Sequence, residues 1–377
     1  MLFDFTQEQL MIRDMVRDFT AKEVEPRDKW MDENGFDHEL HKKLCDAGLM
    51  GVHLPEQYGG ADGDAITSAI VIHELAKGSA STALFVDAHW LAADIILYHG
   101  TEEQKSKYLP MAAAGKIFAF GLTESSAGSD AAGIKSQAVK DGDTWVLNGG
   151  KAWITNSGVA DVYIILAKTQ PELGNKGISA FIVEEGTEGL KIGKKEDKMG
   201  MRGTCTTELS FDNIRLPASA MVGAENSGFK IAMMALDGAR ISVGAIAAGL
   251  AEHAMTIAKH YANERTTFGK PIAKHQGIMF KFADMAAHIE ATTLMTYNVA
   301  RMKAEGKRHT LEAAMAKLFG SEMCTKTCME CIQVLGGYGY SKEYHVERLA
   351  RDAKLLEIGE GTSEILRMLI GATILAK

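Results

Sequence analysis

The chain has 377 residues, 46% of them hydrophobic and 24% charged, with a formal net charge of −8 and a pI of about 5.9. This length is sufficient for two or three domains with a large core. The acidic balance argues against a nucleic-acid-binding protein, because neutralising phosphates requires a basic surface.

The first ten residues contain no basic segment followed by a long apolar run, and they lack the Arg-rich character of a transit peptide. The longest apolar runs are interrupted by charges or glycine before they reach the length of a bilayer span. The sequence therefore predicts a cytoplasmic protein without a membrane span, or a mature form whose leader has been removed.

Residues 1–116 are predicted to form an N-terminal helical domain. Apolar residues recur at helical spacing between Leu2 and Phe19, and further helices are expected over 65–77, 81–99 and 101–114. The last of these begins with Thr101 as N-cap, followed by acidic residues in the first turn.

Residues 117–225 are predicted to form a middle β domain of antiparallel type. The aromatic run at 117–120 indicates a strand, and 139–150 indicates two strands joined by an Asp-Gly turn. Three more β-rich runs follow before residue 212, and the charge run at 194–198 indicates a solvated loop.

Residues 226–377 are predicted to form a C-terminal four-helix bundle. Long helices are expected over 229–261, 274–304 and 310–334, with a stop at Gly336 and a last helix capped by Thr362 or Ser363. The fold class is therefore α+β, mostly α. Helices of this length indicate packing across a bundle or a subunit interface.

Three of the five cysteines, Cys324, Cys328 and Cys331, share one face of a predicted helix. This spacing is compatible with a metal site, but neither a histidine nor a fourth cysteine is near in sequence, so a buried apolar stripe is the preferred interpretation. No metal is predicted.

Three stretches point most clearly to chemistry: 121–130, 151–156 and 360–365. In the first, glycines and hydroxyls follow a strand, where backbone N–H groups can approach a flat or anionic ligand. By itself this stretch is equally compatible with an ordinary turn. Trp153 in the second stretch either covers a flavin ring or fills the core. Glu360, between two glycines, is either a solvated turn residue or a carboxylate placed in a cleft.

In combination, the three stretches resemble the flavin and base signatures of the acyl-CoA dehydrogenase family, in the order and at the chain length found there. The resemblance extends to 235–240, 265–269, 275–276 and 333–337, and so spans about residues 5–377. It points to the short-chain, butyryl-like subgroup or to the alicyclic acyl-CoA subgroup. It implies FAD as cofactor, an acyl-CoA thioester as substrate, an electron-transfer flavoprotein as redox partner, and a homotetramer.

The resemblance also assigns site residues. Arg265 would meet the FAD pyrophosphate, and 333–337 would reach the adenine dinucleotide of a neighbouring subunit. The expected cofactor-binding residues are Phe120, Leu122, Thr123, Gly128, Ser129, Trp153, Ile154, Thr155, Arg265, Thr267, Phe268, His275, Gln276, Gln333, Leu335, Gly336, Gly337, Thr362 and Glu364. The expected substrate-binding residues are Ser129, Asp237, Arg240, Gly361 and Asp87.

The mechanism implied is α,β-dehydrogenation of the thioester. Glu360 would remove the α-proton while the β-hydrogen leaves as hydride to flavin N5. A flavin ribityl hydroxyl and the Glu360 N–H would bind the thioester oxygen, and exclusion of water would raise the pKa of the carboxylate. Isovaleryl members carry the base one residue before the equivalent of Arg240, where this chain has Ala239, so the base should be Glu360.

Two features leave the acyl group open. Gly359 stands where many straight-chain members have tyrosine, which removes bulk beside the reacting carbons. Asp87 lies in an apolar helix that forms the closed end of the acyl pocket in the family. It either faces solvent or pairs with a cation, or it shapes a pocket for a cyclic acyl group, as in alicyclic relatives.

Other functions remain compatible with the sequence. The same scaffold can run in reverse as an enoyl-CoA reductase, because the residues are the same. A non-catalytic flavin-binding relative is disfavoured by the net charge and by Glu360. An oxidase is disfavoured because such relatives have longer chains.

Overall fold

The computed structural model describes residues 5–376, and the segment before the sheet is helical as expected. Its helices are α1 (Gln7–Phe19), α2 (Glu25–Asn34), α3 (His38–Asp46), α4 (Ala65–Ala76), α5 (Ala80–His99) and α6 (Glu102–Ala113). Thr101 caps α6 through its side chain, which accepts from the Gln104 N–H in a reciprocal capping box. The prediction of Thr101 as N-cap is therefore confirmed.

The middle of the chain forms one eight-stranded sheet. Its strands are β1 (Phe118–Gly121), β2 (Gln137–Asp141), β3 (Thr144–Thr155), β4 (Val162–Lys168), β5 (Ile178–Glu184), β6 (Leu190–Lys195), β7 (Thr206–Pro217) and β8 (Met221–Val222). The order is β6-β7-β3-β2-β4-β5-β8, with β1 beside β4. Most pairs are antiparallel as expected, but β1 and β2 each pair with β4 in parallel, so the sheet is mixed.

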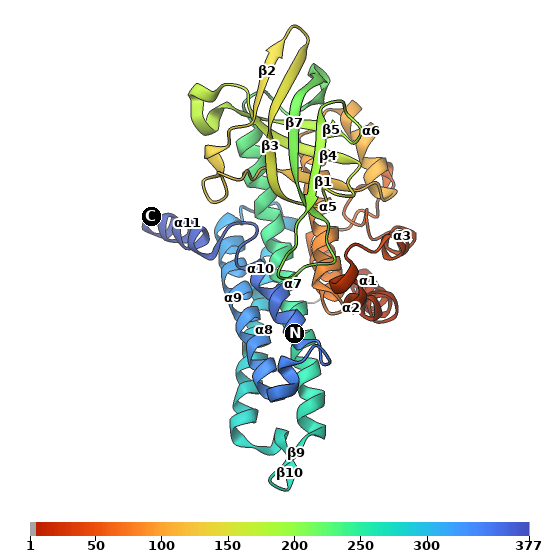
Figure 1. Cartoon of the computed structure of the whole chain (residues 1–377), viewed down its shortest axis with the longest axis vertical. Helices are drawn as coiled ribbons and strands as arrows, with labels where there is room; N and C mark the ends of the chain where they lie inside the picture. Colours follow the sequence, from red (N-terminus) through yellow and green to blue (C-terminus); the bar gives the residue numbers. More distant parts are fainter. Residues whose placement is uncertain (1–4, 377) are drawn as a thin grey trace.

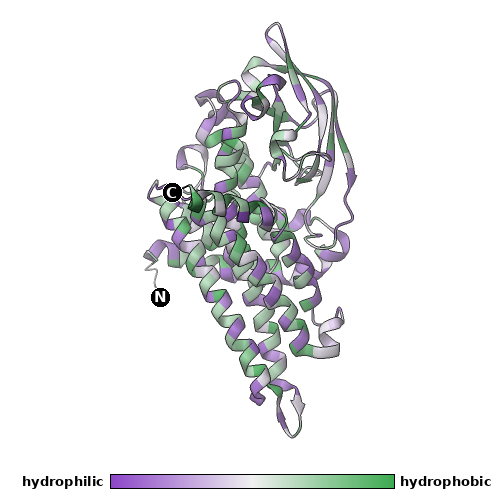
Figure 2. Cartoon of the chain, turned by 90° about the vertical axis from the view of Figure 1, so that its left-hand side faces the viewer, coloured by the Kyte–Doolittle hydropathy of each residue, from purple (hydrophilic) through white to green (hydrophobic). Residues whose placement is uncertain are grey.

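The C-terminal helices form a bundle. They are α7 (Gly228–Glu264), α8 (Gln276–Ala304), α9 (Thr310–Leu335), α10 (Val346–Leu356) and α11 (Ser363–Leu375), with a small hairpin of β9 (Thr266–Thr267) and β10 (Lys270–Pro271) between α7 and α8. Figure 1 shows the sheet at one end of the long axis, the hairpin at the other, and α11 projecting sideways from the bundle. Figure 2 shows apolar residues along the bundle helices and towards the C terminus.

Close helix contacts bring the N-terminal helices onto the bundle. At Gly249 on α7, an added Cβ would lie 2.3 Å from the His73 carbonyl oxygen on α4. Only glycine permits this approach, because any side chain would push the two helices apart. The packing of α4 and α5 on α7 places the face of α5 that carries Asp87 against the bundle.

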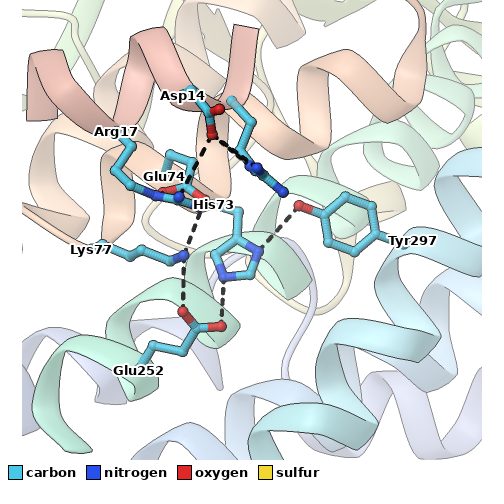
Figure 3. Close-up of polar contacts among 8 residues, drawn as sticks. Asp14, Arg17, His73, Glu74, Lys77, Glu252 and Tyr297 are labelled. Atoms are coloured by element: carbon cyan, nitrogen blue, oxygen red, sulfur yellow. Dashed lines mark hydrogen bonds and ion pairs between the residues drawn. The ribbon is translucent and has the colours of Figure 1, made fainter. Parts of the chain in front are cut away.

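A network of polar side chains reinforces the same junction (Figure 3). Glu74, which is 4% exposed, pairs with Arg17 of α1 at 3.1 Å and with Lys77 at 3.0 Å. Lys77 also pairs with Glu252 of α7 at 2.9 Å, and His73 lies 3.1 Å from Glu252. Burial opposes the charge of Glu252, but His73 and Lys77 outweigh it and lower the pKa of Glu252 to about 2. The network therefore ties α1 and α4 to the bundle electrostatically.

Two helices are long and apolar enough to cross a membrane by length and composition alone. They are α5 and α7, whose most apolar windows are 89% and 61% buried inside the fold. The expected interruptions by charge or glycine occur in both, at Asp87 and Asp94 in α5 and at Gly244 and Gly249 in α7. The burial of α5 and α7 is typical of core helices.

The cysteine stripe is buried. Cys324, Cys328 and Cys331 are 1%, 0% and 0% exposed, and the Cys331 thiol lies 3.5 Å from the Met285 sulfur. The three side chains therefore belong to the apolar core of the bundle. No group of three His, Cys, Asp or Glu residues able to hold a metal occurs within residues 5–376.

Candidate functional site

Glu360 lies in the turn between α10 and α11. Its φ is 54° and that of Gly361 is 99°, so two successive residues adopt left-handed backbone. This conformation is costly for a residue with a side chain and is typical of positions that orient a functional group. The next residue, Thr362, caps α11 by accepting from the Ile365 N–H, which confirms the expected start of that helix.

Two cations fix this turn through its backbone. Arg240 of α7 donates from Nε to the Glu360 carbonyl oxygen at 3.3 Å, and Lys317 of α9 donates to the Gly361 carbonyl oxygen at 2.6 Å. The Glu360 Oε2 atom is buried and has no hydrogen-bond partner among the described residues. A buried carboxylate oxygen without a partner is costly, and it marks a group available to a ligand.

Burial raises the pKa of Glu360 above its ordinary value, and the positive charges of Arg240 and Lys317 oppose this only in part. A carboxylate whose pKa is raised towards the working pH accepts a proton more readily than a solvated one. The geometry and the electrostatics of Glu360 therefore suit a group that accepts a proton.

Asp237 lies one turn before Arg240 on α7. Its Oδ1 accepts from Arg240 at 2.7 Å, and its Oδ2 accepts from the Thr310 hydroxyl at 2.6 Å. Both carboxylate oxygens are thus engaged within the protein. In this arrangement Asp237 positions Arg240, which in turn positions Glu360.

The first and second sequence stretches lie side by side. The Ala152 N–H donates to the Thr123 carbonyl oxygen at 2.9 Å, which joins the loop after β1 to β3. Gly128 and Ser129 are exposed, and an added Cβ at Gly128 would meet no atom within 4 Å. Thr123 and Thr155 are half-buried, whereas Leu122 and Ile154 are buried, so the last two offer mainly backbone atoms to a ligand. Phe120 is half-buried on β1.

A buried ion pair holds these two stretches together. The Lys151 side chain is 0% exposed, and its Nζ lies 2.7 Å from Glu124 Oε1 and 3.1 Å from the Leu122 carbonyl oxygen. Glu124 also accepts from the backbone N–H groups of Lys135 and Ser136 at 2.6 and 3.0 Å. Burial opposes ionisation of Glu124, but Lys151 and these donors more than offset it, so the pKa of Glu124 is lowered. The spacing of Glu124 and Lys151 in the sequence did not indicate this ion pair, although both residues lie in the stretches 121–130 and 151–156.

Trp153 does not fill the core. It is 60% exposed and has a φ of 61°, and the pairing of β3 with β7 is interrupted between Lys151 and Ile154. A bulge of this kind turns a side chain out of the regular alternation of a strand. The core interpretation of Trp153 is therefore wrong, and its indole ring is available to a ligand.

A second group of expected cofactor residues surrounds the hairpin at the far end of the bundle. Arg265, Thr267 and 335–337 line a cavity of about 620 Å³ together with Tyr261 and Tyr338. Around this cavity, Phe268 is 97% exposed and Gln333 is exposed on α9. The Thr267 hydroxyl lies 3.2 Å from His275 Nε2, and the next residue, Gln276, begins α8.

One chain does not bring the two groups together. Figure 1 shows β3 and the β9–β10 hairpin at opposite ends of the long axis. This separation is compatible with the expectation that the hairpin and 333–337 serve a neighbouring subunit. Glu364 is exposed in the first turn of α11, away from the cavity at the hairpin.

Asp87 faces inward. Its side chain is 3% exposed and lies beside the Ser242 hydroxyl on α7. Burial, with the nearby negative charge of Glu360 as a further cause, raises the pKa of Asp87 to about 8. Asp87 also lines a cavity of about 250 Å³ between α5 and α7. The interpretation of Asp87 as a solvent-facing residue is therefore wrong.

The residues near Trp153 suit a flat cofactor such as FAD. An exposed indole, an open glycine position and backbone groups of two adjoining stretches meet here, and a cavity with an arginine is available at the hairpin for an anionic part. Sequence reasoning missed Lys317 and Ser242, because both reach the site from helices distant in the chain.

Comparison with known proteins identifies relatives over the whole chain. Family models match residues 6–116 (acyl-CoA dehydrogenase, N-terminal domain), 119–214 (acyl-CoA dehydrogenase, middle domain) and 226–375 (acyl-CoA dehydrogenase, C-terminal domain). An acyl-CoA dehydrogenase of Bacillus subtilis is 47% identical over 98% of both chains. A short-chain-specific acyl-CoA dehydrogenase of Clostridium acetobutylicum is 45% identical over 99% of both. The acryloyl-CoA reductase (NADH) of Anaerotignum propionicum is 44% identical over 100% of this chain and 96% of its own.

Solved structures agree over the same length. Butyryl-CoA dehydrogenase from Megasphaera elsdenii superposes with a TM-score of 0.97 at 44% identity, covering 99% of each chain. A chain from a structure described as the electron transferring flavoprotein of Acidaminococcus fermentans has a TM-score of 0.98 at 42% identity and covers 100% of each chain.

Proposed function

This chain belongs to the acyl-CoA dehydrogenase family, and on that premise we propose that it dehydrogenates a short-chain or alicyclic acyl-CoA thioester, with Glu360 as the base. The observation that carries the proposal is the buried Glu360 Oε2 atom, which has a raised pKa and no partner among residues 5–376. FAD is the cofactor of the family and, when bound, supplies at its N5 atom the acceptor for the β-hydrogen as hydride.

The protein's own residues bind, orient and deprotonate the substrate in this proposal. Glu360 Oε2 takes the proton from the carbon next to the thioester carbonyl. Arg240 and Lys317 hold the turn that carries Glu360, so that the carboxylate keeps one position. The Glu360 N–H is the donor that we assign to the thioester oxygen, where negative charge develops. Burial of the Glu360 carboxylate limits its contact with water and keeps its pKa raised.

The acyl preference can be tested with a substrate panel. We expect cyclohexanecarbonyl-CoA to exceed butyryl-CoA in kcat/KM, because Gly359 leaves room beside the reacting carbons. An added Cβ at Gly359 would meet only the Leu355 carbonyl oxygen at 3.7 Å, so the backbone there accommodates a Cβ atom. Gly359→Tyr should therefore fold and shift the preference towards butyryl-CoA. The measurement is dye-coupled turnover at fixed enzyme concentration. A clear preference for butyryl-CoA in both the wild type and Gly359→Tyr would show that the enzyme is an ordinary short-chain dehydrogenase.

The reductase of Anaerotignum propionicum supports a second candidate function, reduction of an enoyl-CoA on the same scaffold. The same residues serve dehydrogenation and reduction, so only a comparison of the two rates distinguishes these functions. The dehydrogenase assignment requires turnover of butyryl-CoA or cyclohexanecarbonyl-CoA with a dye acceptor. Reduction of crotonyl-CoA that is much faster than this turnover would favour the reductase. A non-catalytic relative is not favoured, since Glu360 is present and its Oε2 atom has no hydrogen-bond partner within residues 5–376.

We assign an electron-transfer flavoprotein as the redox partner. The structural similarity to a chain from the Acidaminococcus fermentans structure supports this assignment. A cytoplasmic location and domain boundaries at 116/117 and 225/226 remain predictions of the sequence.

We further assign a homotetramer. Met368, Ile374 and Leu375 on the projecting α11 are 69%, 52% and 87% exposed, and apolar side chains at this exposure are suited to a subunit interface. The distance between the hairpin and β3 within one chain also favours an oligomer, because a neighbouring subunit could bring the two groups of cofactor residues together. Light scattering should give the mass of four chains for the FAD-loaded protein. A stable FAD-loaded monomer would contradict the assignment.

A further inference from the structure

A polar cavity of about 250 Å³ lies behind Asp87, where α5 and α7 face each other. Both helices contribute residues at helical spacing, Asp87, Trp90, Asp94 and Tyr98 from α5 and Ala235, Ala239 and Ser242 from α7. His53 and Lys303 approach from the loop after α3 and from the end of α8. The space is therefore lined by elements that are distant in the sequence.

An ion pair forms one wall of this cavity. Asp94 lies 3.2 Å from His53 Nε2 and 3.7 Å from Lys303 Nζ. Burial opposes the charge of Asp94, but His53 and Lys303 outweigh it and lower its pKa, and Asp94 in turn raises the pKa of Lys303. The opposite charges of Asp94 and Lys303 are therefore both retained and largely cancel. Asp87, whose pKa is raised to about 8 by burial, is protonated at neutral pH and offers a hydroxyl donor.

The polar atoms of this wall are only partly satisfied. The His53 side chain is 9% exposed, its Nε2 atom meets only Asp94 Oδ1 at 3.2 Å, and its Nδ1 atom has no hydrogen-bond partner among the described residues. The Asp94 Oδ1 atom is buried and has only this contact with His53. Buried polar atoms without partners are costly, and an alkyl chain beside them would leave that cost in place.

The cavity adjoins the base. Ala239 lines it, and the next residue, Arg240, donates to the Glu360 carbonyl oxygen. The charge of Glu360 also acts on Asp87. An acyl group with its reacting carbons at Glu360 can therefore place its far end in this cavity, beside Asp87 and the ion pair.

We propose that this cavity selects acyl groups whose far end carries a neutral hydrogen-bonding oxygen, a hydroxyl or a carbonyl, over plain alkyl groups of equal size. The proposal rests on the proposed function and names its substrate class. Asp87, His53 and Lys303 supply donors, and Asp94 supplies an acceptor. A neutral oxygen is favoured over a carboxylate, which would meet Asp64 and Asp94, and over an ammonium group, which would meet Lys303.

The test uses two thioesters that differ only by OH in place of the terminal CH₃, namely 6-hydroxyhexanoyl-CoA and heptanoyl-CoA. Dissociation constants are measured on the FAD-loaded Glu360→Gln protein, where the ligand is not consumed, and kcat/KM is measured on the wild type. We expect the hydroxy compound to bind at least about tenfold more tightly and to have the higher kcat/KM. Equal binding, or tighter binding of heptanoyl-CoA, would overturn the proposal.

Matched variants assign the effect to the cavity. Asp87→Leu should abolish or reverse the preference for the hydroxy compound, and Lys303→Met provides a second variant if Asp87→Leu does not fold. Asp18→Leu, at an exposed position of α1, should keep the wild-type preference. A preference that survives both cavity variants would refute the role of this wall. Turnover with butyryl-CoA and cyclohexanecarbonyl-CoA separates the two proposals, because its absence with both refutes the dehydrogenase function even where the binding preference persists.

Discussion

Glu360→Gln is expected to lower kcat for acyl-CoA dehydrogenation by a factor of about 10²–10⁴, the range for loss of a positioned base. Gln is similar in size but cannot accept the α-proton at neutral pH. The contacts of Arg240 and Lys317 with this turn go to backbone oxygens, so the substitution leaves them intact. FAD content and acyl-CoA binding should therefore remain near wild type. The measurements are dye-coupled turnover, the visible flavin spectrum and a ligand dissociation constant.

The stability of this variant separates loss of the base from misfolding. Because the folded-state pKa of Glu360 is raised, the native state holds its proton to higher pH than the unfolded chain. Its contribution to stability therefore falls as pH rises from the ordinary Glu value through the raised value. The neutral Gln removes this penalty, so the Tm at pH 7 should be no lower than that of the wild type.

The control is Glu357→Gln, one turn earlier, whose carboxylate pairs with Lys354 at 2.8 Å. It should retain turnover. In the wild type, kcat/KM should fall as pH decreases through the raised pKa of Glu360, because only the ionised form accepts a proton. Turnover of Glu360→Gln within a few-fold of wild type would show that another residue is the base.

Lys151→Met is expected to have the largest effect on folding and on FAD retention. It leaves the Glu124 carboxylate, whose side chain is 8% exposed, without its cation. Removing one partner of a buried ion pair costs about 3–5 kcal/mol. The same pair joins the loop after β1 to β3, so the positions of Thr123 and Trp153 should also be disturbed. The purified variant should contain less FAD and unfold at a lower temperature.

The double variant Lys151→Met/Glu124→Gln tests this cause. Removing the unpaired charge should restore part of the lost stability, whereas the link to the Leu122 carbonyl oxygen stays absent. Lys191→Met, at a side chain that is 70% exposed on β6, is the matched control and should behave as wild type. A Lys151→Met protein with wild-type FAD content and Tm would show that the ion pair does not organise the site.

The sequence by itself predicted features that depend on neighbouring residues. The caps at Thr101 and Thr362 and the Asp-Gly turn between β2 and β3 all form as expected. The fold class and family followed because three short stretches occur together. Each of these features is decided within a few residues, where side-chain hydrogen bonds and backbone preferences act directly.

Only the tertiary structure decided features that join distant segments. The parallel pairing of β1 with β4 links residues 44 positions apart, such as Phe118 and Val162, and no local pattern specifies it. Trp153 is exposed because a bulge interrupts β3, and Lys198 of the expected solvated loop is half-buried, donating to the Thr204 carbonyl oxygen at 2.8 Å. These outcomes depend on pairing between strands, which the alternation of a single strand does not encode.

The same limit applies to the site. The sequence identified Glu360 and singled out Asp87. It did not show that Lys317 fixes the turn of Glu360, or that Asp87 lines a cavity with Asp94 and Lys303. Burial and charge at these positions arise from the packing of α5, α7, α8 and α9. The pKa of a carboxylate depends on the atoms around it in space, so the chemical character of Glu360 and Asp87 was decided only when these helices came together.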